Sequence, residues 1–275
     1  MTISKNEILS KLHQLPSMPQ VVQEVMASLQ NKKLDISVLA SMIARDQGLS
    51  AKVLRVANSS FYGQPRNVAS VQDAVVVLGF NCVWSLVLAA GLANVFPVAP
   101  GSLFDRNEYW QRSFRVAGYA KAVAQGLHQE PQMAFTAGLF HEVGQLVLDV
   151  CIPDQFSQVL LQQKNSALSL VEIELSQWDF DHALIGGEMA RQWSFPSEIE
   201  HAVHYWRTPE QKPFQPVTGL IHAAVLLESG FRADHFIEKL PGTLRDKLQI
   251  NWKSIAAYMP DPNQLEEEAG WMAAS

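Results

Sequence analysis

The stretch "GLFHEVGQLVL" at residues 138–148 sets His141 directly beside Glu142 inside an otherwise apolar segment. An adjacent imidazole and carboxylate can help to bind a divalent metal ion, which lowers the pKa of a bound water and holds a phosphate for hydrolysis. A core helix can equally carry one hydrogen-bonded histidine that has no chemical role. The pair therefore leaves two interpretations open, a metal site and a buried structural histidine.

Other histidines extend the set of candidate ligands. His182 follows Asp181 at the start of an expected helix, where it either helps to cap that helix or faces the same site. His201 and His204 are three residues apart on one helical face, a spacing that can bind metal but is also common by chance. His222 falls on an apolar helix, where we expect a hydrogen-bonded core histidine.

No motif for a different chemistry competes with these residues. The chain has no nucleophile elbow, no phosphate-binding glycine loop and no dinucleotide fingerprint. Cys82 and Cys151 lie in apolar stretches, which raise the pKa of a thiol and make it a poor nucleophile. They are far apart and form no C-x-x-C pair, and residues 1–10 do not resemble a secretory leader, so we expect a reducing cytoplasm.

Composition indicates an ordinary globular protein. The 275 residues are 48% hydrophobic and 17% charged, enough for one large or two modest domains with hydrophobic cores. The net charge is -6 and no cluster of Lys and Arg occurs, which disfavours direct binding of nucleic acid.

The apolar segment at residues 74–93 raises the question of a membrane span. It carries no charge and approaches the ~20 residues that a spanning helix requires. Gly79 and Asn81 interrupt it, Asn81 as the expected cap of a second helix, and its flanks lack Lys and Arg anchors. We therefore expect buried core helices and no membrane span.

Apolar residues recur at helical spacing along the chain, and no alternating pattern typical of strands competes, so the sequence predicts an all-α fold. In the N-terminal part we expect a helix at 18–30, another from a cap at Asp35 to Gly48, and a third beginning at Ser50. The proline-flanked stretch 94–110 suggests a boundary between an N-terminal lobe at 1–100 and a second lobe at 101–240, followed by an extension at 241–275. Later helices are expected at 107–126, 132–150, 154–164, 170–177, 182–193, 197–206 and 217–228.

Several motifs together resemble the HDOD domain family. They are "LPSMPQVVQEV", "IARDQGLSAKVLRVANSSFYG", "SVQDAVVVLGF", "AGLFHEVGQLVL" and "DFDHALIGGEMARQWSFP", in the expected order over about residues 10–230. The resemblance implies a two-lobed, all-helical fold whose C-terminal bundle is similar to HD domains, in the phosphohydrolase superfamily that includes HD-GYP proteins. It also implies a bacterial protein of signalling or regulation. Gln47 stands where the family usually has proline.

The same resemblance implies that the metal site is degenerate. The superfamily's metal is held by a first histidine, an adjacent His-Asp pair and a distal aspartate, and here His141 and Glu142 occupy the pair. Arg112, next to Ser113, falls at the first histidine, and a guanidinium repels a metal ion. Four more positions have changed: Gln145 replaces a lysine of active relatives, Trp206-Arg207 replaces a histidine pair, and Ala224 falls at the distal acid.

We expect Arg112 to form a salt bridge with Glu142 in place of the metal, because a buried carboxylate requires a partner. Removing Glu142 is then expected to strand a buried guanidinium.

The sequence leaves two functions open. The first is a non-catalytic regulatory module that needs no cofactor and binds a partner protein or a small signal molecule through its N-terminal helices and the cleft between the lobes. Asn58 and Ser59 are a candidate binding surface, although such a run after a helix is also typical of a turn and cap. The alternative is a metal-dependent phosphohydrolase or phosphodiesterase that binds Fe, Mn, Ni or Zn. Its rebuilt site would use His141, Glu142, His182 and either His204 or His222.

Overall fold

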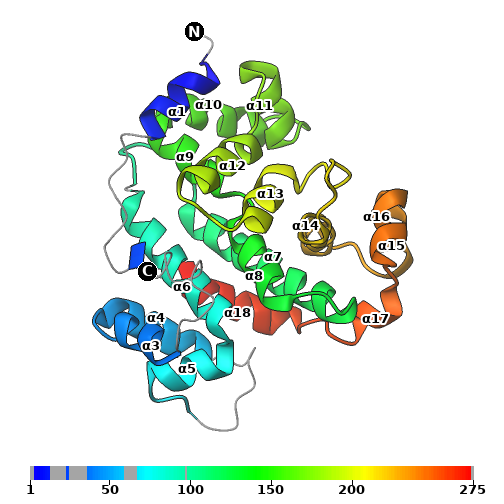
Figure 1. The fold of residues 1–275 in the computed structure, drawn as a ribbon. Helices are drawn as coiled ribbons and strands as arrows, with labels where there is room; N and C mark the ends of the chain where they lie inside the picture. The colour runs from blue at the N-terminus through cyan, green and yellow to red at the C-terminus, as the bar shows by residue number, and fades with distance from the viewer. Residues whose placement is uncertain (1–2, 13–22, 25–35, 59–66, 97, 274–275) are drawn as a thin grey trace.

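The computed structural model describes residues 3–12, 23–24, 36–58, 67–96 and 98–273 (Figure 1). These residues form helices and no strand, which confirms the predicted all-α class. The helices are α1 (Lys5–Leu12), α3 (Ile36–Ile43), α4 (Gln47–Ala57), α5 (Val71–Leu78), α6 (Phe80–Val95), α7 (Arg106–Gly126), α8 (Pro131–Phe140), α9 (Val143–Cys151), α10 (Pro153–Lys164), α11 (Leu170–Trp178), α12 (His182–Gln192), α13 (Ser197–Tyr205), α14 (Pro216–Glu228), α15 (Ala233–Lys239), α16 (Gly242–Leu248), α17 (Trp252–Ala256) and α18 (Pro262–Ala273).

The long helix α7 is the centre of the C-terminal part, where it packs against α8, α14, α17 and α18 (Figure 1). Asp105 caps its first turn by accepting a hydrogen bond from the Glu108 amide. Alanines and glycines on several faces, among them Ala117, Gly118 and Ala120, are buried and allow neighbouring helices to approach closely. The neighbours that surround α7 on most sides hold this helix in place.

His141 and Glu142 lie at a break between two helices, where the sequence predicted one continuous helix at 132–150. That prediction is wrong because α8 ends at Phe140 and α9 begins at Val143. The break permits close packing of α9 on α12: a Cβ atom at Gly144 would overlap the His182 carbonyl oxygen and lie 2.8 Å from the Gly186 amide nitrogen. The chain therefore turns at the His-Glu pair and presents it toward α12.

The start of α4 also differs from the sequence prediction. The Asp46 carboxylate caps it by accepting a hydrogen bond of 3.0 Å from the Leu49 amide, so Gln47 is the first helical residue. Gly48 and Ser50, expected at a helix end and a helix start, both lie inside α4. The helix expected at 18–30 and the cap expected at Asp35 lie outside the described residues, apart from Gln23 and Glu24, which are helical.

The apolar segment at 74–93 is divided between α5 and α6, and the two helix axes differ by 117°. Gly79 makes the turn with φ +84°, a conformation that favours glycine. Asn81 is not the cap that we expected, because α6 already begins at Phe80. No single helix within the described residues is long and apolar enough to cross a membrane, although the bent pair passes the same test by length and composition.

The two ends of the chain pack on the C-terminal part. Helix α1 contacts α9 and α12, and the Lys11 ammonium donates a hydrogen bond of 3.0 Å to the Cys151 carbonyl. Helix α18 lies along α7, where Leu265 packs against Gly118. In Figure 1, α1 is accordingly distant from α3, α4 and α5. The division at residues 100 and 240 stays a prediction, and the structure adds that contacts cross both boundaries.

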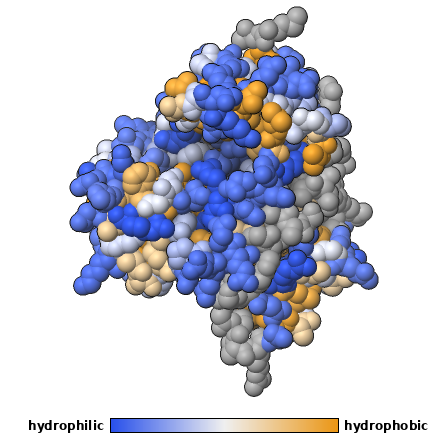
Figure 2. All heavy atoms as spheres, turned by 180° about the vertical axis from the view of Figure 1, so that it is seen from behind, coloured by the Kyte–Doolittle hydropathy of each residue, from blue (hydrophilic) through white to orange (hydrophobic). Residues whose placement is uncertain are grey.

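The described surface opposite the view of Figure 1 is mainly hydrophilic, with apolar residues in separate patches (Figure 2). Large exposed apolar side chains include Ile36, Val38 and Val76 on α3 and α5. Scattered apolar residues are normal on a protein surface and carry no function by themselves.

We predict that Gly144→Ala destabilises the fold by about 3 kcal/mol, because its methyl group would force α9 away from the backbone of α12. The matched control is Gly48→Ala on α4, where the added Cβ would meet only the Asp46 side chain at 3.3 Å. Chemical denaturation of both variants beside the wild type measures the difference. Equal stability of the two variants would show that α9 and α12 do not pack this closely.

Candidate functional site

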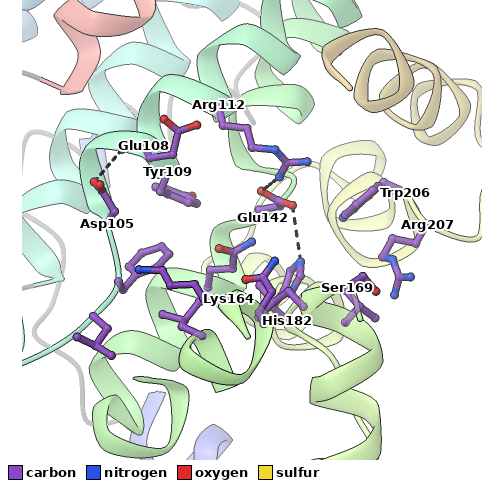
Figure 3. A pocket seen from close by; sticks show the side chains of 17 residues that line it. Asp105, Glu108, Tyr109, Arg112, Glu142, Lys164, Ser169, His182, Trp206 and Arg207 are labelled. Carbon is purple, nitrogen blue, oxygen red and sulfur yellow. Dashed lines mark hydrogen bonds and ion pairs between the residues drawn. The ribbon is translucent and has the colours of Figure 1, made fainter. Parts of the chain in front are cut away.

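A pocket of about 550 Å³ opens beside Glu142, within the C-terminal part and not in a cleft between the expected lobes (Figure 3). Helix α7 contributes Arg112, the α8–α9 break contributes Glu142, and α12 contributes His182. The remaining lining residues come from the loop before α7 and from α7, α9, α10, α11 and the end of α13: Leu103, Phe104, Asp105, Glu108, Tyr109, Gln145, Leu160, Gln163, Lys164, Ser169, Leu170, Val171, Trp206 and Arg207.

The Arg112 guanidinium pairs with the Glu142 carboxylate on one wall of the pocket, which confirms the expected salt bridge (Figure 3). The Glu142 side chain is 7% exposed and the Arg112 side chain 28%. Burial opposes ionisation of Glu142, but Arg112, His141 and His182 outweigh it and hold its pKa at about 2. The carboxylate is therefore charged at neutral pH and already bound by a cation.

Glu228, at the end of α14, is a second partner of Arg112 that sequence reasoning missed. Its carboxylate accepts from Arg112 Nε at 3.3 Å and from Arg115 Nη2 at 3.1 Å, so it joins two arginines of α7. Arg115 also binds Glu108 and Glu266, which ties α18 to this network. Ala224, the expected position of a distal acid, is buried one turn earlier on α14.

His141 is fully buried below the pocket and neutral. Its Nδ1 donates to the Gly138 carbonyl at 2.7 Å, which turns Nε2 toward Glu142 Oε2 at 3.8 Å. Burial lowers the pKa of the imidazole to about 4, and the nearby Arg112 charge acts in the same direction. The side chain is therefore both a structural histidine with a backbone partner and a member of the site, so the two initial interpretations overlap.

His182 is held by Glu174, a second residue that sequence reasoning missed. Glu174 is fully buried on α11 and accepts from both the backbone amide of His182, at 3.0 Å, and Nδ1, at 2.8 Å. Burial alone would lower the pKa of His182, but Glu174, together with Glu142 and Asp181, raises it above its ordinary value. His182 Nε2 points toward Glu142 Oε1 at 3.9 Å.

Trp206 and Arg207 close the opposite side of the pocket. The Trp206 ring meets the His141 ring edge-on with centroids 5.2 Å apart, and the Trp206 carbonyl accepts from His222 Nδ1 at 3.0 Å. Arg207 binds the Asp181 carboxylate at 3.1 Å. His222 is thus a hydrogen-bonded histidine, as predicted, and it does not line the pocket.

The residues present do not fit the metal centre of the HD superfamily. His141, Glu142 and His182 converge, but the carboxylate already binds a guanidinium, which a metal ion would have to displace. His204 stacks on Tyr205 outside the pocket, and His201 Nδ1 pairs with Thr218 at 2.8 Å. Over the described part of the chain, no group of three or more His, Cys, Asp and Glu is arranged to hold a metal ion.

Asn58, expected as part of a binding surface, has a structural role. It ends α4, and its side-chain amide exchanges hydrogen bonds with the backbone of Val68, at 2.8 Å from Nδ2 and 2.6 Å to Oδ1. Ser59 lies outside the described residues.

Comparison with known proteins gives the family. The sequence model of the HDOD domain matches residues 15–209, so the chain belongs to the HDOD family. "Uncharacterized protein YuxH" of Bacillus subtilis (strain 168) is 22% identical over 190 residues, which are 64% of this chain and 46% of that protein. The chain therefore spans about half the length of this curated relative.

Solved structures share the fold over nearly the whole chain. A "Putative phosphohydrolase" from Shewanella amazonensis SB2B has a TM-score of 0.78 at 23% identity, covering 97% of this chain and 98% of that one. An HDOD domain protein of unknown function from Geobacter sulfurreducens has a TM-score of 0.75 at 23% identity, with 92% of each chain covered. A "Putative signal transduction protein" from Marinobacter aquaeolei VT8 has a TM-score of 0.76 at 25% identity, covering 94% of this chain and 60% of that one.

Removing Glu142 was expected to strand a buried guanidinium, but the Arg112 side chain is 28% exposed and the Glu142 side chain 7%. Because Arg112 is partly exposed and keeps Glu228, Glu142→Ala should cost only about 1 kcal/mol. Arg112→Leu leaves the buried Glu142 carboxylate without its cation and should cost about 3 kcal/mol. The double variant, Glu142→Ala with Arg112→Leu, should recover most of the stability that Arg112→Leu alone loses. Urea denaturation of the three variants measures this, and a larger loss for Glu142→Ala than for Arg112→Leu would contradict it.

The two buried histidines should titrate on opposite sides of their ordinary pKa of 6.5. His141 resists protonation until about pH 4, so its contribution to stability is complete above pH 6.5 and is lost as the pH falls from 6.5 toward 4. His182 has a raised pKa, so its contribution is complete below pH 6.5 and is lost as the pH rises through that raised value.

Imidazole NMR of the wild type and of Glu174→Gln checks these directions. In the wild type, His141 should stay neutral from pH 8 to 5 while His182 loses its proton above pH 6.5. In Glu174→Gln, the influence of burial on the His182 imidazole outweighs the remaining acids, so the pKa of His182 should fall. A wild-type His182 midpoint below 6.5 would refute the role given to Glu174.

Proposed function

We propose that this chain is a non-catalytic regulatory module that acts by binding a partner protein or a small signal molecule. The observation that carries the proposal is the ion pair between Arg112 and Glu142, which puts a fixed cation where the superfamily's metal would meet its carboxylate ligand. A pocket remains beside this ion pair, as a binding module requires. The signal-transduction name of the Marinobacter protein agrees with such a role.

The proposal includes a cytoplasmic location and no direct contact with nucleic acid. Two widely spaced cysteines in 275 residues favour a reducing compartment, and the net charge of -6 disfavours a phosphate backbone as partner. No resident cofactor is part of the proposal.

One observation favours a second candidate, a metal-dependent phosphohydrolase. His141 Nε2 and His182 Nε2 are buried without a hydrogen-bond partner, and both face the Glu142 carboxylate. Glu174 orients His182 as a carboxylate commonly orients a metal-binding histidine. If Arg112 moved away, these three groups would form a partial ligand set for Fe, Mn, Ni or Zn.

Elemental analysis and phosphatase assays separate the two candidates. Wild-type protein grown with each metal in excess should contain none in stoichiometric amount and should not hydrolyse p-nitrophenyl phosphate or its bis ester. Arg112→His removes the guanidinium and adds an imidazole, so it should raise metal content. Arg115→His, one turn along α7 and outside the pocket, is the matched control and should not. Stoichiometric metal with hydrolysis in the wild type would overturn the proposal.

A further inference from the structure

Most charges around the pocket are already compensated within the protein. Arg112 is bound by Glu142 and Glu228, and Arg207 is bound by Asp181. Among the described cations that line the pocket, this leaves the exposed Lys164 as the one that forms no ion pair with a described residue. A ligand with several negative charges would therefore have to compete with these carboxylates for its cations.

Two buried nitrogens at the pocket, by contrast, have no hydrogen-bond partner among the described residues. Trp206 is 8% exposed and its indole Nε1–H is unpaired; His182 is 1% exposed and its Nε2 is unpaired. Both side chains line the pocket, His182 from α12 and Trp206 from the residue that follows α13 (Figure 3). A buried polar group without a partner is destabilising, so two such groups at one pocket indicate a polar ligand.

The geometry of His182 fixes what its free nitrogen can do. Glu174 accepts the proton of Nδ1, which leaves Nε2 on the side of the pocket wall, toward Glu142 Oε1 at 3.9 Å and beyond a normal hydrogen bond. Nε2 accepts a hydrogen bond when the ring is neutral and donates one when it is charged. Trp206 Nε1–H can only donate. A matching ligand thus needs an acceptor for Trp206 and a group next to it that can pair with His182.

Beside its polar residues, the pocket has an apolar and partly aromatic part. The Phe104 and Tyr109 rings pack with centroids 5.6 Å apart, and Leu160, Leu170 and Val171 line the pocket from α10 and α11. The Tyr109 hydroxyl is also buried without a hydrogen-bond partner among the described residues. The pocket volume of about 550 Å³ lies in the range of small-molecule sites, which combine apolar walls with a few placed polar groups. Aromatic walls of this kind pack well on a flat ring.

We propose that the pocket binds a small, planar, uncharged molecule with an amide-like edge, whose carbonyl accepts from Trp206 Nε1–H and whose adjacent group pairs with His182 Nε2. This inference rests on the proposed non-catalytic function, because a metal ion at His182 would occupy the same nitrogen. It disfavours a phosphate ester as the preferred ligand, since both arginines that line the pocket are already paired and only the exposed Lys164 is not.

The test uses uncharged planar amides as probes, namely uracil, benzamide and quinazolin-4-one, beside uridine 5′-monophosphate and inorganic phosphate. In ¹⁵N-labelled, metal-free protein, at least one amide should shift the indole N–H signal of Trp206, identified by its loss in Trp206→Phe. Affinity for that amide should fall about tenfold in Trp206→Phe, which keeps a ring but removes the donor. Trp252→Phe, on α17 away from the pocket, is the matched control and should bind as the wild type does.

The outcomes separate this inference from the proposed function. If no amide shifts the wild-type Trp206 signal, or if uridine 5′-monophosphate or phosphate binds metal-free protein more tightly than every amide, the inference is wrong and the regulatory proposal stands. If phosphate probes bind only after metal is added, with metal held in stoichiometric amount, the regulatory proposal itself fails. The wild-type measurements decide these cases even if Trp206→Phe does not fold.

Discussion

The ion pair between Arg112 and Glu142 is the interaction on which the character of the site depends. A carboxylate that is 7% exposed needs a nearby positive charge, and the chain supplies a guanidinium from α7. The guanidinium, unlike a metal ion, is covalently attached to the chain. Glu228 then fixes the guanidinium from its other side.

The surrounding helices serve this arrangement by close packing and by buried hydrogen bonds. Gly144 lets α9 approach the backbone of α12, so the chain turns at His141 and Glu142 and both side chains meet His182. Glu174 holds His182 from behind. The resulting pocket has paired arginines on its walls and buried nitrogens without a hydrogen-bond partner on Trp206 and His182, which supports the ligand-binding role that we propose.

The sequence allowed prediction of the parts that depend on local pattern or on a family resemblance. Helical periodicity gave the all-α class, and the resemblance placed Arg112 next to Glu142. It did not allow prediction of the helix break at 141–142, because that break depends on the contact of Gly144 with a helix some forty residues later in the chain. Glu174 and Glu228 were missed for the same reason: an acid in an amphipathic helix is ordinarily exposed, and only tertiary packing shows that these two face His182 and Arg112.

We propose that the Arg112 guanidinium occupies the place of a metal ion beside Glu142. Anomalous diffraction from crystals grown with Mn²⁺ or Zn²⁺ tests it most directly. We expect no anomalous peak between His141, Glu142 and His182, with the Arg112 guanidinium in hydrogen-bonding contact with the Glu142 carboxylate. A peak bonded to both histidine Nε2 atoms and to Glu142, with Arg112 turned away, would contradict it.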